Sequence, residues 1–244
     1  MNLSPTSRPP AQISTMFDKP FFPPDQPWYV WTVVILCFVF WLLAYALIIR
    51  WSFKDKTFGM PIAALIGNIA WEGLFSHYFV PSFWLIQLGN TAWVGLDVLI
   101  FIAAWKYGPA DFAEPFIKRW LRTIMVVGVV MTCWIEIPFT RVYHDEHGYL
   151  LGWAQAFMMA ILFIAMLVRR NSLKGQTIYT ALAMLLGNIA AYLWCEYFPD
   201  TPPRLDHSVN LAFLVGTGFF NVVYVVMLWQ RCRELGVNPW RRFW

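Results

Sequence analysis

The stretch PIAALIGNIAWEGLFSHYFV, residues 61–80, decides the fold class. It is apolar over about 20 positions, the length that a helix needs to cross the hydrocarbon core of a bilayer. Its one formal charge is Glu72. An ionised carboxylate in hydrocarbon costs roughly 2.5–3.5 kcal/mol on insertion scales. We therefore expect a membrane-spanning helix whose carboxyl group is buried against protein and has a functional role.

The whole chain has the composition of a membrane protein. Of its 244 residues, 59% are hydrophobic and 13% are charged, whereas soluble domains average about 25% charged. Apolar runs long enough to span a bilayer lie at residues 28–49, 58–79, 88–107, 121–140, 150–168, 177–197 and 209–230. The sequence therefore predicts an all-α membrane protein, with seven transmembrane helices in one bundle.

The short loops predict a single transmembrane domain over residues 28–232. Residues 1–27 are polar and Pro-rich and lack a basic segment followed by an apolar one, so we expect a disordered tail and not a cleaved signal peptide. Residues 233–244 form a C-terminal tail. Most of the 18 Lys and Arg residues fall in alternate loops and in this tail, which predicts a cytoplasmic C-terminus and an extracytoplasmic or lumenal N-terminus.

The tetrapeptide GNIA occurs twice, at 67–70 and at 187–190. The predicted helices that carry it have the same orientation, so a 3+1+3 parallel repeat fits the pattern. Chance similarity between two Gly- and Ala-rich packing segments would give the same match. Both explanations stay open.

Polar side chains gather in the predicted outer half of the bundle. Asn68 and Glu72 are spaced i,i+4, and so are Asn188, Tyr192 and Glu196; residues at this spacing share a helix face. Further polar residues of the same predicted region are Asp97, Glu136, Asn221 and Tyr224. Glu136 and Glu196 lie near the interface, where a structural role is the simpler interpretation. Asn68 and Asn188 also suit hydrogen bonds between helices.

Aromatic side chains are expected at the same depth. These are Trp71, Trp93, Trp134, Trp153, Tyr192 and Trp194. Each π face stabilises a desolvated cation by roughly 0.5–2 kcal/mol, although many such residues pack in helix interfaces or form interfacial belts. Burial in apolar surroundings favours the neutral form of a carboxylic acid, which then acts as a proton donor. A proton donor among aromatic faces suits reactions that begin by protonation and proceed through carbocations.

Several other chemistries lack their motifs. The last apolar run holds no lysine for a retinal Schiff base, and no acidic cluster for a Mg²⁺-bound diphosphate, HExxH, GxSxG or P-loop occurs. The four cysteines form no CxxC pair. The run His144–His147 could bind a metal but is also typical of a solvated loop. We expect no metal and no other cofactor. The basic residues are spread along loops, which excludes a nucleic-acid partner.

Four segments resemble one known family, the small seven-helix membrane terpene cyclases of fungal meroterpenoid and indole-diterpene pathways, which also have bacterial relatives. They are DKTFGMPIAALIGNIAWEGLFSHYFVP (55–81), TAWVGLDVLIF (91–101), the region of Glu196 with the aromatic residues and the proline that follow it, and NVVYVVMLWQRCRE (221–234). The resemblance implies an isomerase- or lyase-type enzyme that protonates an epoxide or alkene of a prenyl chain and directs its cyclisation without a metal. The implied partners are a prenylated, epoxidised small molecule and the lipid bilayer.

The resemblance also implies roles for single residues. The family's first essential acid matches Glu72. Its second acid is an Asp in a D-x-x-Y setting on the last helix, where this chain has Asn221 and Tyr224. We therefore expect Asp97 to tune or re-protonate Glu72, Asn221 to orient the epoxide, acid or water, and Glu196 to polarise the network. Expected substrate-binding residues are Asn68, Trp71, Trp93, Trp134, Glu136, Trp153, Asn188, Tyr192, Trp194 and Tyr224.

Two rival functions use the same features. A proton-coupled transporter or lipid-binding protein built on the repeat would use these acids for coupling, and it requires a polar path toward the inner side. The inner halves of the predicted helices are nearly all apolar, which counts against it. A non-catalytic receptor or assembly subunit would leave the buried acids unexplained.

Overall fold

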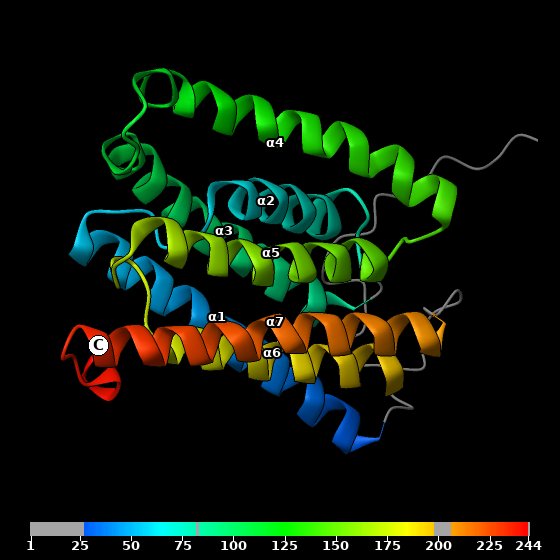
Figure 1. Cartoon of the computed structure of the whole chain (residues 1–244). Coiled ribbons are helices and arrows are strands. Elements are labelled where there is room, and N and C mark those ends of the chain that lie inside the picture. Colours follow the sequence, from blue (N-terminus) through cyan, green and yellow to red (C-terminus); the bar gives the residue numbers. More distant parts are fainter. Residues whose placement is uncertain (1–26, 82, 198–205, 244) are drawn as a thin grey trace, which may run out of the picture.

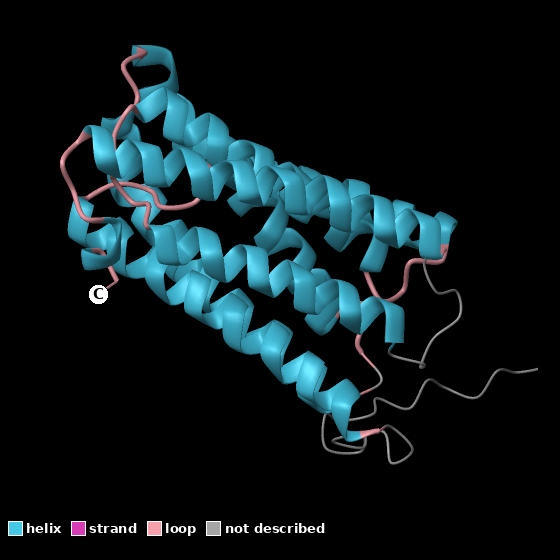
Figure 2. Ribbon diagram, turned by 60° about the horizontal axis from the view of Figure 1, so that its bottom comes forward, coloured by secondary structure: helices cyan, strands magenta, loops and turns pink. Residues whose placement is uncertain are grey.

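A computed structural model describes residues 27–81, 83–197 and 206–243 of the chain. The described residues form helices and loops with no strand (Figure 2). The helices run in the order α1 (Trp28–Asp55), α2 (Ile62–His77), α3 (Trp84–Tyr107), α4 (Pro115–Tyr143), α5 (Tyr149–Arg170), α6 (Ile178–Tyr197) and α7 (His207–Glu234), with 3₁₀ turns η2 (Gly108–Asp111) and η3 (Pro239–Arg241). The prediction of an all-α bundle of seven helices is confirmed. The predicted N-terminal tail lies outside the described residues, apart from Pro27.

Local chemistry fixes where these helices begin and end. Prolines precede α1 and α2 or open α4, positions at which the missing N–H costs no helical hydrogen bond. Asp206 caps α7, because its side chain accepts a hydrogen bond from Ser208 N at 2.8 Å. Helices α1 and α5 end on Lys56 and Asn171, both in the left-handed conformation that closes a last turn.

Six of the helices are long and apolar enough to cross a membrane, which makes the chain a multi-pass membrane protein. Helix α2 is the exception. Its 16 residues span ~24 Å at 1.5 Å per residue, less than the ~30 Å hydrocarbon core. It ends at His77, although the apolar run continues to Val80. Neighbouring helices α3, α4 and α5 pack around it (Figure 1), so its polar side chains are shielded by protein.

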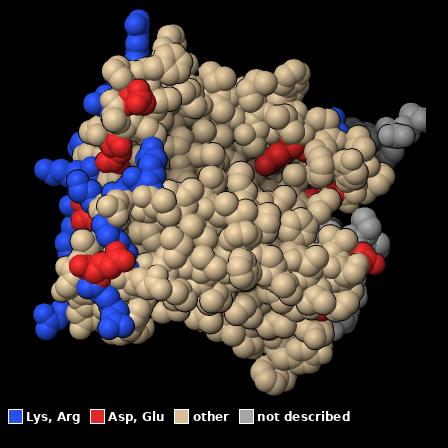
Figure 3. Space-filling model, in the orientation of Figure 1, with Lys and Arg blue, Asp and Glu red and all other residues tan. Residues whose placement is uncertain are grey.

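The surface divides into an apolar middle and a basic end. Large apolar side chains such as Val39, Val127, Val130 and Phe219 are exposed along the helices, as expected for contact with lipid. Lys and Arg side chains gather at the end that holds the C-terminus (Figure 3). We call this the basic end. The opposite end, with the α2–α3 and α4–α5 loops, is called the cavity end.

Close helix packing closes the bundle between α1 and α6. Gly187, in the second GNIA segment, faces Trp41; a Cβ atom on this glycine would lie 2.9 Å from the indole. Toward the basic end the interior is filled with apolar side chains, among them Ile48, Leu65, Ile100, Phe163 and Leu228. The predicted repeat itself is not tested by this arrangement and stays a prediction.

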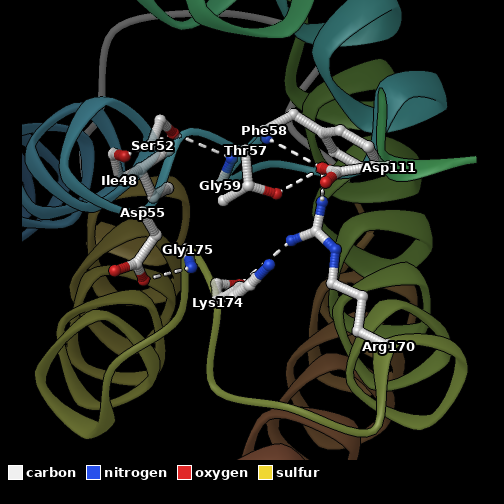
Figure 4. Close-up of polar contacts among 10 residues, drawn as sticks. All are labelled: Ile48, Ser52, Asp55, Thr57, Phe58, Gly59, Asp111, Arg170, Lys174 and Gly175. Atoms are coloured by element: carbon white, nitrogen blue, oxygen red, sulfur yellow. Dashed lines mark hydrogen bonds and ion pairs between the residues drawn. The ribbon is translucent and has the colours of Figure 1, made fainter. Parts of the chain in front are cut away.

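Hydrogen bonds to Asp111 hold the loops of the basic end together (Figure 4). We call this set of contacts the lock. Asp111 of η2 accepts hydrogen bonds from the Thr57 hydroxyl, from Phe58 N at 3.4 Å and from Arg170 Nη2 at 3.1 Å. These bonds connect the α1–α2 segment to η2 and to the end of α5. The stretch DKTFGM, which is part of the family resemblance, therefore fixes the start of α2. It thereby also fixes how deep in the bundle the residues of α2 lie.

The C-terminal segment joins this lock and is not a free tail. Helix α7 runs on to Glu234, and η3 folds back against the bundle. Arg242 Nη2 donates to Asp55 Oδ2 at 2.8 Å and to the Leu173 carbonyl at 3.0 Å, and its guanidinium lies 3.9 Å from the centre of the Trp51 ring. Asp55 also accepts from Gly175 N at 2.9 Å. Over the residues that the structure describes, this segment is therefore held against the bundle, and the predicted domain boundaries stay a prediction.

Candidate active site

A large cavity opens toward the cavity end of the bundle. It holds about 1220 Å³ of empty space, counting its open mouth. Helices α1, α2, α3, α5 and α6 and the α2–α3 and α4–α5 loops supply its wall. Most of the lining is apolar or aromatic: Trp41, Tyr45, Trp71, Phe75, Phe79, Phe83, Trp93, Tyr149, Trp153 and Trp194. Its polar lining side chains are Asn68, Glu72, Asn90, Glu146, His147, Gln155 and Asn188.

Two buried carboxyl groups meet on one amide nitrogen. Asn68 Nδ2 lies 3.0 Å from Glu72 Oε1 and 2.9 Å from Asp97 Oδ2, within donor distance of both. Glu72 and Asp97 are 3% and 0% exposed. The Glu72 side chain lines the cavity, whereas Asp97 lies behind it. The expectation that Asn68 and Glu72 share a helix face is confirmed, and α3 brings Asp97 to the same point.

Tyr45 and Gln155 complete this network. The Tyr45 hydroxyl donates to Glu72 Oε1 and also contacts Asn68 Nδ2, and the side-chain amides of Gln155 and Asn68 are hydrogen-bonded to each other. The network therefore joins α1, α2, α3 and α5. Because low-dielectric surroundings strengthen satisfied hydrogen bonds, the five side chains hold each other in one arrangement.

One carboxyl oxygen of each acid is available to another group. Glu72 Oε2 and Asp97 Oδ1 are buried and accept no hydrogen bond from an N–H or O–H of the described residues. The two carboxyl groups share the Asn68 nitrogen, and a hydrogen bond between carboxyl groups requires a proton on one of them. A buried oxygen without a partner is costly, so the site suits a shared proton or a polar atom of a bound molecule.

Fixed aromatic faces line the rest of the cavity. Trp93 stacks on Phe38 at 4.7 Å between ring centres, and Trp194 packs against the same ring at 5.9 Å. Trp71 Nε1 donates to the Gly148 carbonyl at 3.0 Å, which anchors this ring at the mouth. Gly148 has φ +70°, and a Cβ there would lie 2.8 Å from the Trp71 nitrogen, so glycine permits both the turn and the close approach.

Helix α6 presents a different face to the cavity than its spacing predicted. Asn188, Ala191, Trp194 and Cys195 line the cavity, an i, i+3, i+6, i+7 pattern. The expected i,i+4 series instead turns Tyr192 and Glu196 away, and neither lines the cavity. Helix pitch explains the difference. Because a turn holds about 3.6 residues, each step of four residues rotates the side chain further around the axis, so Tyr192 and Glu196 leave the face that Asn188 presents.

Four other expected residues lie outside the cavity. Trp134 is 68% exposed on α4, the helix that packs mainly on α2. Glu136 is buried on the same helix but does not line the cavity. Asn221 is completely buried on α7, and neither atom of its amide has a partner among the described residues. Tyr224 donates to Gln176 Oε1 at 3.0 Å, closer to the basic end. Helix α7 supplies no lining residue; it packs on the α5 and α6 helices, which do line the cavity.

Tyr45 was not among the residues expected from the sequence. A tyrosine in an aromatic-rich apolar run gives no signal of its own. Its spacing from Trp41 could have pointed to it, since the two lie i,i+4 and both line the cavity. The segment 144–147 forms the loop before α5. Its Asp145 side chain accepts hydrogen bonds from Leu150 N and Leu151 N, in the first turn of α5, at 3.1 and 3.0 Å. Within the described ranges no three His, Cys, Asp or Glu side chains are grouped to hold a metal ion.

The bundle and its site define a class: a multi-pass membrane protein with a pair of buried carboxyl groups at the wall of an aromatic cavity. A sequence model of the Pyr4-like transmembrane terpene cyclases matches residues 18–234. The chain belongs to this family, and it is therefore a terpene cyclase, an enzyme of secondary metabolism that closes rings. This assignment also sets aside the transporter and receptor alternatives.

Individual relatives agree with the family. Terpene cyclase andB from Emericella variicolor is 30% identical over 205 residues, covering 80% of this chain and 86% of the relative. The Pyr4-family terpene cyclase mfmH from Annulohypoxylon moriforme is 26% identical over 215 residues, covering 85% and 88%. Asnovolin H synthase nvfL from Aspergillus novofumigatus is 33% identical over 99 residues, covering 40% and 41%. No solved structure matches this chain.

Proposed function

We propose that this enzyme cyclises an epoxidised prenyl chain of a meroterpenoid or prenyl-indole, and that Glu72 starts the reaction by protonating the epoxide. The observation that carries the proposal is the shared Asn68 nitrogen, which holds the carboxyl groups of Glu72 and Asp97 together at the cavity wall. Two carboxylates this close and this buried repel each other, so one of them keeps a proton. Glu72 faces the cavity and is the one placed to give it away.

The reaction conserves atoms. The O–H bond of Glu72 breaks as a bond forms between the proton and the epoxide oxygen, and one C–O bond of the epoxide then opens to leave a carbocation. Alkene π electrons of the prenyl chain attack this carbon, and each attack closes a ring and moves the charge along the chain. Loss of a proton from a carbon next to the last cation ends the sequence, so substrate and product are isomers.

The hydrogen bonds around Glu72 favour the forward proton transfer. Once Glu72 has lost its proton, its Oε1 already accepts from the Tyr45 hydroxyl and from Asn68 Nδ2. Hydrogen bonds to an ionised group are about twice as strong as neutral ones, so these donors stabilise the carboxylate more than the acid. Asp97, on the same Asn68 amide, would return a proton to Glu72 for the next cycle.

The aromatic lining suits the cationic intermediates. Trp71, Trp93 and Trp194 line the cavity with the acid, and their faces attract a desolvated cation by roughly 0.5–2 kcal/mol each. The apolar walls also keep water away from a cation that water would quench. By resemblance to the fungal cyclases, we expect the substrate to carry an aromatic or indole head group at its polar end. This head group would lie at the mouth of the cavity, beside the α4–α5 loop.

The orientation of the termini belongs to the same proposal. Lys and Arg gather at the basic end (Figure 3), which favours a cytoplasmic position for that end. The cavity would then open toward the extracytoplasmic or lumenal side.

Product analysis tests the proposed function. Membranes from cells that express the full chain are incubated with farnesyl and geranylgeranyl aromatic compounds, each supplied with and without its terminal epoxide. Mass spectrometry and NMR then identify the products. We expect cyclised isomers from at least one epoxidised compound and none from its epoxide-free counterpart. Cyclisation of the epoxide-free compounds at an equal rate would contradict epoxide protonation.

A further inference from the structure

A hydrogen-bonded chain runs from the surface of the cavity end to the cavity wall. Trp153 Nε1 donates to Asn210 Oδ1 at 2.8 Å, and Asn210 Nδ2 donates to Glu196 Oε2 at 3.0 Å. His207 Nδ1 lies 2.7 Å from Glu196 Oε1, the other oxygen of the same carboxyl group. The chain therefore links α5, α6 and α7 near their ends at the cavity mouth.

Trp153 stands at the inner end of this chain. Its side chain is 3% exposed and lines the cavity. The ring is nearly parallel to that of Phe213, with an interplanar angle of 10° and 6.2 Å between ring centres. The indole is therefore held by packing on Phe213 and by one hydrogen bond at its nitrogen, and it has little freedom to turn.

We propose that Glu196 and Asn210 are positioning residues that fix and electronically enrich the Trp153 ring, and that Trp153 determines which carbocation the cavity stabilises. The inference rests on the proposed function, because it assigns the ring pattern and not the initiating proton. A carboxylate that accepts from the Asn210 amide orients that amide, so its carbonyl oxygen faces the indole N–H. Consecutive hydrogen bonds also polarise one another, which draws the indole proton outward and leaves more negative charge on the π face.

This role differs from the one that the sequence analysis gave to Glu196. There Glu196 was expected to act on the Glu72 network. In the structure its side chain contacts Asn210 and His207 and does not line the cavity. Asn210 Oδ1 accepts its hydrogen bond from the Trp153 indole, so the influence of the carboxylate passes to Trp153 and to the cation beside it.

The expected consequence is a change in products and not in initiation. Trp153→Phe keeps an aromatic ring but removes the N–H donor, and Glu196→Gln keeps the size of the side chain but removes its charge. Because both variants keep Glu72 and its proton, each should still consume epoxidised substrate, unlike Glu72→Gln. Each should also raise the ratio of partly cyclised to fully cyclised product, by roughly 2- to 30-fold, the range that a cation–π contribution of 0.5–2 kcal/mol allows.

A double-mutant cycle makes the test specific. If Glu196 acts through the indole N–H, Glu196→Gln should add little to the product ratio in a Trp153→Phe background. Glu196→Asp, which keeps the charge, should restore part of the wild-type ratio. The matched control is Glu234→Gln at the basic end, where Glu234 pairs with Arg231 on the surface, and it should leave the ratio unchanged. Thermal unfolding in detergent checks that each variant is folded.

The outcomes separate this inference from the proposed function. Independent, multiplicative effects of Glu196→Gln and Trp153→Phe would overturn it, and so would an unchanged ratio in Glu196→Gln. Loss of substrate consumption in Glu196→Gln to the level of Glu72→Gln would instead make Glu196 part of initiation. If the wild-type enzyme cyclises the substrate, Glu72→Gln does not, and Glu196→Gln leaves the ratio unchanged, the proposed function stands and this inference alone fails.

Discussion

Glu72 of α2 and Asp97 of α3 lie on the same nitrogen of Asn68, at 3.0 and 2.9 Å. This relationship places two acids of different helices in one buried network. Asn221 holds the place of the acid that the family resemblance implies on the last helix, and it does not line the cavity. Asp97 shares the Asn68 nitrogen with Glu72, and the proposed function gives it the part of the second acid.

Replacement of Asp97 should therefore impair catalysis. Asp97→Asn keeps the size of the side chain but removes the second carboxyl group, so Glu72 loses the group that returns its proton. Because a positioned acid or base contributes about 10²- to 10⁴-fold, we expect turnover to fall by at least ~100-fold. The rate of product formation in membranes measures it. Activity within twofold of wild type would show that Asp97 has a structural role.

Tyr45→Phe removes one donor to Glu72 without emptying the site. A hydrogen bond to a charged group contributes about 1.5–3 kcal/mol, which corresponds to roughly 10- to 100-fold in turnover if it forms in the transition state. Binding should change little, since the phenyl ring still lines the wall. Steady-state kinetics separates the two effects. A raised KM with unchanged kcat would contradict the role in proton transfer.

Two residues outside the cavity supply negative predictions. Glu136→Gln and Trp134→Leu alter α4, which contributes no lining side chain from its helix. We expect both variants to keep turnover and product ratio within about twofold, because Trp134 is exposed and the buried Glu136 does not line the cavity. A loss comparable to that of Asp97→Asn would mean that α4 closes on the cavity when substrate binds.

The close contact between α6 and α1 predicts that a larger residue at Gly187 disturbs the packing. A Cβ on Gly187 would lie 2.9 Å from Trp41, so Gly187→Ala should lower stability by about 1–3 kcal/mol, the usual cost of overpacking. Gly73→Ala on α2 is the matched control, because nothing lies within 4 Å of its added Cβ. Alanine is a better helix former than glycine, so the unfolding temperature of this variant should be no lower than that of wild type in a thermal scan in detergent.

The lock of the basic end predicts a larger loss of stability. Asp111 and the Arg170 guanidinium form an ion pair at 3.1 Å with side chains 15% and 7% exposed. Asp111→Asn leaves the arginine without its counter-charge, and breaking such a buried pair costs about 3–5 kcal/mol. The exposed pair of Arg231 and Glu234 is the comparison, since Glu234→Gln should cost less than ~1 kcal/mol. Equal melting temperatures for the two variants would contradict the lock.

Hydropathy alone predicted most of the fold. The seven apolar runs overlap all seven helices of the structure, because the length of a spanning helix is set by the bilayer. The short length of α2 escaped this reasoning. Residues Tyr78–Val80 are as apolar as the helix, and apolar character does not distinguish a helix end from the loop that packs beside it.

The site was predicted along each helix but not between helices. The i,i+4 spacing put Asn68 beside Glu72, and the hydrogen bond confirms it. Spacing does not give the rotation of one helix against another. It therefore left Asp97 as a candidate only, and it assigned Tyr224 to a cavity from which α7 is excluded. Tyr45 required the placement of α1 relative to α2, which brings its hydroxyl to Glu72 and which no local pattern reports.

Substitution of Glu72 by glutamine tests the central claim most directly. Glu72→Gln preserves shape and hydrogen bonding to Tyr45 and Asn68 while removing the transferable proton. Cyclised product from an epoxidised prenyl substrate, measured by mass spectrometry in membranes with matched protein levels, should fall below detection, and the substrate should be recovered intact. Wild-type rates of cyclisation in Glu72→Gln membranes would contradict the account.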